Sequence, residues 1–79
     1  MFREKTKKVL VTFPTTTQAM KMERYGKAAG IPGRLIPVPV QISAGCGMAW
    51  CSPEEERERL ENCIREAEIE TERMVHLML

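Results

Sequence analysis

The sequence has few aromatic residues and a single histidine, His76. Aromatic side chains make up 5% of the 79 residues. RNA-binding sheets stack bases on several exposed aromatic rings, which this composition does not favour. Every histidine-dependent catalytic set would have to share His76, and no glycine-rich phosphate loop is present. These absences favour a binding protein over an enzyme.

An excess of one sign of charge and long apolar runs are also absent. The formal net charge is +1, from 12 basic and 11 acidic residues, whereas nucleic-acid binders usually show a clear basic excess. No apolar run approaches the ~20 residues of a membrane span. Residues 1–8 are charged and lack the apolar core of a signal peptide. We expect a cytoplasmic protein that binds neither nucleic acid nor a membrane.

Cysteine is present in an odd number, because Cys46, Cys51 and Cys63 are the only three. A disulfide framework uses an even number, and a reducing compartment keeps thiols free. The Cys-x4-Cys spacing of the first two is not a usual zinc signature. The sequence therefore predicts free or reactive thiols, with no metal and no other cofactor.

The chain length limits the fold to one domain over residues 1–79. Its 43% hydrophobic content supports one modest core, expected over about residues 8–79, behind a charged lead-in at 1–7. Such a small domain hides a limited share of its surface, which makes a homodimer a reasonable expectation.

Residues 8–13 form a β-branched run that predicts the first strand. Alternation places Val9, Val11 and Phe13 toward the core and Leu10 and Thr12 on the other face. Threonines at 15–17 predict a capped helix that runs to about residue 29. Within it, Gly26 would let the helix lie close to the sheet.

Residues 33–40 predict a second strand that contains Pro37 and Pro39, and prolines confine such a strand to the edge of a sheet. A short third strand follows at 47–51. Ser52, Pro53 and the glutamates after them predict a capping box that opens a second helix.

The last segment, residues 69–79, has two interpretations. It either forms a fourth strand or continues the second helix, because apolar residues from 60 to 78 also fit a heptad spacing. The second interpretation gives an alternative fold of three strands with a long C-terminal helix.

Residues 30–39 (GIPGRLIPVP) and 42–49 (ISAGCGMA), with the early Val-Thr-Phe strand and the threonine-rich cap, carry a resemblance. From about residue 8 to 79 the chain resembles the bacterial selenium/sulfur carrier protein-like family, a small α/β domain of unknown function. Cys46 and Gly47 match the family's Cys-Gly pair. Members tend to have a break before a final strand, where this chain has Glu68.

The resemblance implies a final strand and thus the order β-α-β-β-α-β. This is a ferredoxin-like α+β sandwich with an antiparallel sheet in the order 4-1-3-2. The second strand then lies at an edge, as its prolines require.

In that topology the turn between the second and third strands lies near the start of the first helix. Cys46 is the candidate nucleophile or carrier thiol. Amides and hydroxyls there would form an anion pocket for a thiolate or persulfide. Its expected residues are Thr15, Thr16, Thr17, Gly45 and Gly47.

The resemblance favours a carrier that holds a persulfide- or selenide-type group on Cys46 for a selenium- or sulfur-handling partner enzyme. Two alternatives stay open. One is a non-catalytic interaction module, as a homodimer, in which Cys46 is only a turn residue. The other is a small-ligand sensor.

Overall fold

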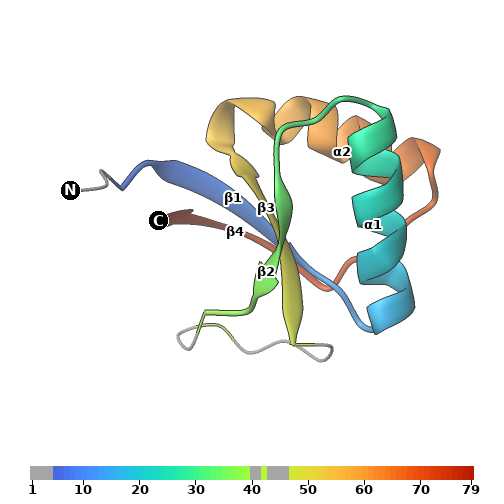
Figure 1. Cartoon of the computed structure of the whole chain (residues 1–79), viewed down its shortest axis with the longest axis horizontal. Helices are drawn as coiled ribbons and strands as arrows, with labels where there is room; N and C mark the ends of the chain where they lie inside the picture. The colour runs from blue at the N-terminus through green and yellow to red at the C-terminus, as the bar shows by residue number, and fades with distance from the viewer. Residues whose placement is uncertain (1–4, 40–41, 43–46) are drawn as a thin grey trace.

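The computed structural model describes residues 5–39, 42 and 47–79. Its elements are β1 (Lys7–Thr12), α1 (Thr16–Ala28), β2 (Arg34–Pro37), β3 (Met48–Pro53), a 3-10 turn η1 (Glu54–Glu56), α2 (Arg57–Glu66) and β4 (Arg73–Met78). The strands form one antiparallel sheet in the order β2-β3-β1-β4, which reads 4-1-3-2 from the other edge. Figure 1 shows the resulting mixed α+β fold.

The alternative prediction of a long C-terminal helix is wrong, because α2 ends at Glu66 and the chain turns there. The amide of Glu68 donates to the carbonyl of Arg65 at 3.3 Å, and the amide of Ile69 donates to that of Ile64 at 3.0 Å. This is a Schellman closure, and it places Glu68 at a φ of 54°, in the left-handed region. A glutamate therefore occupies a position that usually holds a glycine or asparagine.

Two contacts from α1 hold the chain after this turn. The Lys21 ammonium group donates to the carbonyl of Glu68 at 3.1 Å, and the side-chain oxygen of Gln18 accepts from the amide of Glu70 at 2.9 Å. Tertiary contacts thus support a backbone conformation that glutamate disfavours. They direct the chain back to pair with β1 as β4.

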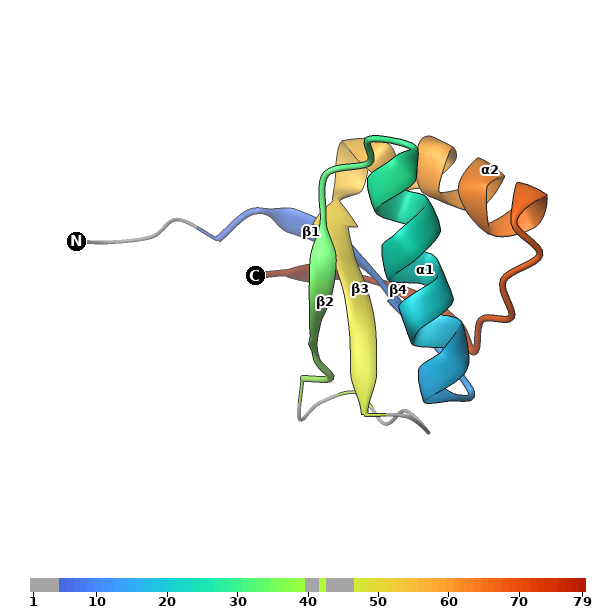
Figure 2. The same ribbon diagram turned by 45° about the vertical axis from the view of Figure 1, so that its right-hand side comes forward.

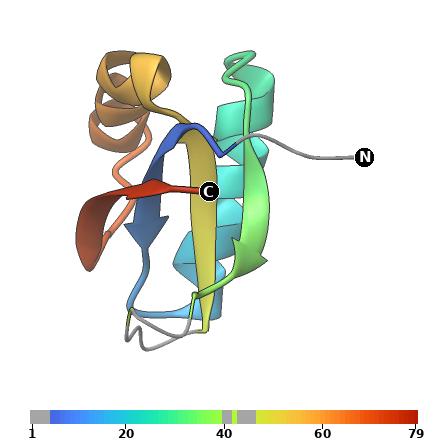
Figure 3. The ribbon, with the colours of Figure 1, turned by 90° about the vertical axis from the view of Figure 1, so that its left-hand side faces the viewer.

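Both helices cover the same face of the sheet, and Figure 3 shows them behind the strands. As expected, Val9, Val11 and Phe13 are fully buried against them, together with Trp50. A Cβ atom at Gly26 would lie 3.1 Å from the Trp50 ring, so the expected close approach of α1 to the sheet is confirmed.

The predicted capping box is wrong, because Ser52 belongs to β3 and is 1% exposed. Its hydroxyl accepts from the indole nitrogen of Trp50 and donates to the carbonyl of Pro32, each at 2.7 Å. Ser52 also pairs with Val9 in the sheet register. Because Ser52 is a residue of the sheet, it does not cap a helix. α2 instead begins after η1 and has no side-chain cap.

β2 is an edge strand, as its prolines predicted, although it is shorter than residues 33–40. On the face away from the helices, Leu10 and Ala49 are fully buried beside Ile42 in a second apolar cluster. Neither helix in the described part of the chain has the length and apolar character needed to cross a bilayer.

Replacing Ser52 with alanine is expected to lower the free energy of unfolding by about 1–3 kcal/mol, because the buried indole N–H of Trp50 and the partly buried carbonyl of Pro32 lose their partner. The measurement is urea unfolding, together with the NMR signal of the Trp50 indole N–H, which should shift. Thr15→Ala is the control, since it removes a true helix cap at a cost of about 1 kcal/mol and should leave the indole signal in place. An unshifted indole signal in Ser52→Ala would contradict the buried role of this hydroxyl.

Candidate functional site

Cys46 and Gly45 lie outside the described residues, so the site is defined by the residues that flank them. Gly47 has a φ of 76°, a conformation that favours glycine. Its carbonyl accepts from the amide of Val38 at 3.0 Å, which joins the two ends of the β2–β3 connection. A Cβ atom on Gly47 would meet nothing within 4 Å, so only the backbone conformation restricts this position.

Ile42 attaches the middle of the same connection to the sheet. Its amide donates to the carbonyl of Pro39 at 2.9 Å. Its side chain is 8% exposed and packs with Leu10 and Ala49 on the face that the helices leave uncovered. The connection is therefore fixed to the body of the protein on both sides of the undescribed residues.

The N-terminus of α1 offers hydrogen-bond donors and no negative charge. Thr15 is the N-cap, and its hydroxyl accepts from the amide of Gln18 at 3.4 Å. The first turn contains no acidic residue, and Thr16 and Thr17 are exposed. Amides in a first helical turn have no partner within the helix and carry the positive end of its dipole. These two threonines can thus present amides to an anion.

The sheet register brings these elements to one end of the molecule. Thr12, the last residue of β1, pairs with Ala49, and Pro37 pairs with Met48. Gly47 and the start of α1 therefore lie at the same end of the sheet (Figures 1 and 2). Among the described residues, no hydrogen bond joins Gly47 to the threonines, so their association with Cys46 remains a prediction.

Thr12 was missed by the sequence reasoning as a residue of this end. It is fully buried, and among the buried side-chain polar atoms of the described residues its hydroxyl is the one without a hydrogen-bond partner. A buried hydroxyl without a partner costs free energy. Threonine is a common residue in β-strands, so the sequence alone does not indicate that Thr12 differs from its neighbours.

Cys51 lies on the face of the sheet that has no helices, paired with Leu10 on one side and Arg34 on the other. Burial raises the pKa of its thiol, and the nearby charges of Lys8 and Arg34 oppose that rise without cancelling it. Cys51 is a free cysteine. At neutral pH it is a protonated, weakly nucleophilic thiol.

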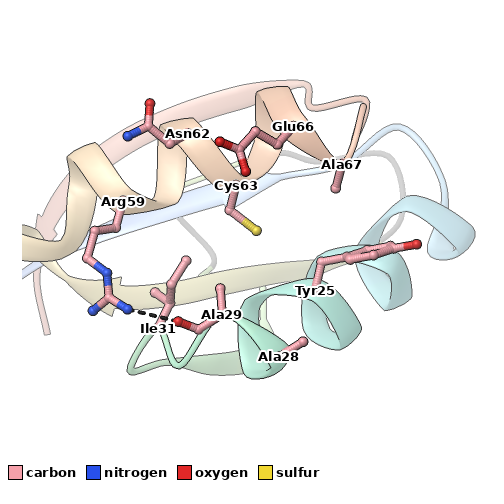
Figure 4. A pocket seen from close by; sticks show the side chains of 9 residues that line it. All are labelled: Tyr25, Ala28, Ala29, Ile31, Arg59, Asn62, Cys63, Glu66 and Ala67. Carbon is pink, nitrogen blue, oxygen red and sulfur yellow. Dashed lines mark hydrogen bonds between the residues drawn. The ribbon is translucent and has the colours of Figure 1, made fainter.

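Cys63 projects from α2 into a groove between the two helices, and it is a buried residue (Figure 4). Burial and the charge of Glu66 raise the pKa of this thiol. Arg59 closes one end of the groove, where its guanidinium donates to the carbonyl of Ala29 at 2.9 Å and stabilises the C-terminus of α1. The groove thus contains a shielded thiol.

Within the part of the chain that the structure describes, no cluster of three or more metal-ligating side chains occurs. His76 lies at the opposite end of the sheet from Gly47, with its Nδ1 atom 3.7 Å from a carboxylate oxygen of Glu54. The expectation of no metal remains a prediction at Cys46.

Comparison with known families gives one match. The family model described as "Putative Se/S carrier protein-like" matches residues 8–76. The matched range includes α1, β2, β3 and α2 and the connection that carries Cys46. A search of curated proteins found no match to the chain.

The raised pKa values predict a specific pH dependence for the thiols of Cys51 and Cys63. The pKa of each thiol is higher in the folded protein than in the unfolded chain, so the folded thiol keeps its proton to a higher pH. Its contribution to stability is therefore complete below the ordinary thiol pKa of about 8.5 and is lost as pH rises through the folded pKa. The measurement is alkylation rate against pH, by mass spectrometry. Both midpoints should lie above those in urea, and a lower midpoint in the folded protein would contradict the shielding.

Proposed function

Because the chain belongs to the Se/S carrier protein-like family, whose model matches residues 8–76, we propose that it is a sulfur or selenium carrier. Cys46 holds the cargo as a persulfide- or selenide-type group, and a partner enzyme loads or receives it. The scaffold is a ferredoxin-like sandwich that presents the β2–β3 connection beside the start of α1.

The observation that carries this assignment is the state of the other two thiols. Burial raises the pKa of both Cys51 and Cys63. A carrier thiol must instead ionise near neutral pH, because the thiolate is the nucleophile. Of the three cysteines, this leaves Cys46, which stands between Gly45 and Gly47 in the sequence.

The surroundings of the connection support an anionic cargo. The first turn of α1 has no acidic side chain, and its N-cap, Thr15, leaves the amides of Thr16 and Thr17 without a partner in the helix. Such amides favour a negative charge placed near them. A thiolate on Cys46, or the persulfide that replaces it, is the anion that this proposal assigns to them.

Loading is a transfer of one neutral sulfur atom from a donor persulfide. The Cys46 thiolate attacks the outer sulfur of a donor R–S–SH, a new S–S bond forms, and the donor S–S bond breaks. The donor leaves as its thiolate R–S⁻, and the persulfide on Cys46 loses its proton to solvent. No net oxidant or reductant is consumed, so the protein needs no redox cofactor for this step.

The first test is loading from a small-molecule persulfide or an inorganic polysulfide. We expect the folded protein to gain the mass of one sulfur atom on Cys46, and Cys46→Ser to gain none. Cys51→Ser and Cys63→Ala are matched controls that should load like the unmodified chain. Loading that persists in Cys46→Ser, or is lost in both controls, contradicts the proposal. The interaction-module alternative predicts no selective loading of Cys46.

The second test adds a negative charge to the proposed anion pocket. Thr17→Glu should stabilise α1 while raising the pKa of Cys46 by about half a unit, because a charge at a helix N-terminus is worth ~0.3–1 kcal/mol. The measurement is the pH midpoint of Cys46 alkylation. Met20→Glu is the control, since it adds the same charge at a side chain 60% exposed beyond the first turn. Equal pH midpoints of Cys46 alkylation in the two variants would mean that Thr16 and Thr17 do not belong to the site.

A further inference from the structure

The sheet face that carries no helix is called here the open face, and it is apolar. Figure 3 looks onto this face, with both helices behind the sheet. Its side chains include Leu10, Ile36, Cys51, Val75 and Leu77, contributed by all four strands. An antiparallel sheet with one face in water usually alternates apolar and polar residues. Leu10 is fully buried beside Ile42, but the residues around it, Ile36, Cys51, Val75 and Leu77, are only partly buried and leave apolar surface for a partner.

The charges on this face are all positive. Lys8, Arg34 and Arg73 point to the same side as Leu10, because they alternate with residues of the helix face or pair directly with open-face residues. Within the described strands, no acidic residue lies on the open face. The described ion pairs use other groups, and none includes Lys8, Arg34 or Arg73. Within the described residues, these three cations therefore have no acidic partner.

A groove of about 650 Å³ lies at one corner of the open face. Lys8 and Arg34 lie along it, and Ile36, Cys51 and Leu79 provide apolar walls. The groove can hold an apolar side chain and place an acidic neighbour beside either cation. Buried apolar anchors flanked by charge complementarity are the usual determinants of affinity and specificity in protein interfaces.

We propose that the open face docks an acidic segment of a partner protein, which inserts an apolar side chain into this groove and pairs its carboxylates with Lys8, Arg34 and Arg73. The partner is recognised by alternating or clustered acidic and apolar side chains. The proposal does not rest on the thiol chemistry, because none of these residues belongs to the proposed carrier site.

Two other binding partners fit this face less well, one because of its positive charges and the other because the described face lacks aromatic rings. A second copy docked face to face would place the same patch against itself, so three cations would meet three cations. Single-stranded RNA is read by aromatic rings on a sheet. Here Phe13 and Trp50 are fully buried on the helix face, and the described open face has no aromatic ring.

The test uses the full chain, labelled with nitrogen-15 for NMR, and a synthetic peptide of alternating glutamate and leucine. We expect the peptide to shift amide signals of Leu10, Cys51, Val75 and Leu77. Salt should weaken its binding, because exposed charge pairs are screened. A peptide with the same leucines and lysine in place of glutamate should bind at least tenfold more weakly. Equal binding of the two peptides would overturn the proposal.

A matched pair of charge reversals locates the binding site. Lys8→Glu and Lys7→Glu change the net charge equally on neighbouring residues of β1, but Lys7 faces the helix side beside Glu54. We expect Lys8→Glu to weaken the glutamate–leucine peptide about tenfold and Lys7→Glu to weaken it less than about twofold. Equal losses would mean that the peptide reads net charge alone, and would overturn the docking face.

A second matched pair tests the apolar contribution on β4. Leu77→Gln removes an open-face side chain, whereas Met78→Gln changes its neighbour on the other face, which is 53% exposed. Weaker peptide binding in Leu77→Gln alone supports the proposal, provided circular dichroism shows that both variants fold. Tighter binding to phosphatidylglycerol vesicles or to a single-stranded oligonucleotide than to the acidic peptide, or concentration-dependent self-association through the same amides, would overturn it.

Discussion

The hydroxyl of Ser52 joins the two halves of this fold. It accepts from the indole of Trp50 within β3 and donates to the carbonyl of Pro32, in the turn that leads from α1 to β2. The approach of that turn is very close, because a Cβ atom on Gly33 would lie 2.5 Å from the Ser52 hydroxyl oxygen and 2.6 Å from the carbonyl oxygen of Cys51. Trp50 in turn fills the space beside Gly26 under α1. One buried hydroxyl thus fixes helix, turn and strand together, and its loss leaves the indole N–H of Trp50 unsatisfied in the core and the carbonyl of Pro32 without its partner.

This arrangement gives the two faces of the sheet different roles. The helix face contains the core and both large buried aromatic side chains, Phe13 and Trp50. The open face contains apolar residues and cations and holds Ile42 of the β2–β3 connection against Leu10. The connection that carries Cys46 is therefore attached to the surface that we propose as the docking face. A partner bound there would lie beside Ile42, which belongs to the same connection as Cys46.

The thiols show how environment separates residues of the same type. Cys63 is shielded between two helices, and Cys51 is shielded within the sheet even though Lys8 and Arg34 lie near it. At Cys51, desolvation outweighs the favourable charges of Lys8 and Arg34. At Cys63, it adds to the unfavourable charge of Glu66, so both side chains keep the thiol form. Thr12 is a different case, since its buried hydroxyl has no partner in the described structure and it lies at the end of the sheet where α1 begins.

Sequence patterns alone determined the order of the elements up to α2, the core face of β1 and the edge position of β2, because alternation, helix spacing and proline act locally. For residues 69–79 they left both a strand and a continued helix open. They also singled out Cys46, whose place in the structure lies outside the described residues. Tertiary structure alone decided the role of Ser52, where a buried hydrogen-bond pair outweighed a local capping pattern. It also decided the end of α2, where contacts from Lys21 and Gln18 hold Glu68 in a conformation that its own propensity disfavours. Both decisions depend on residues distant in sequence, which no local pattern contains.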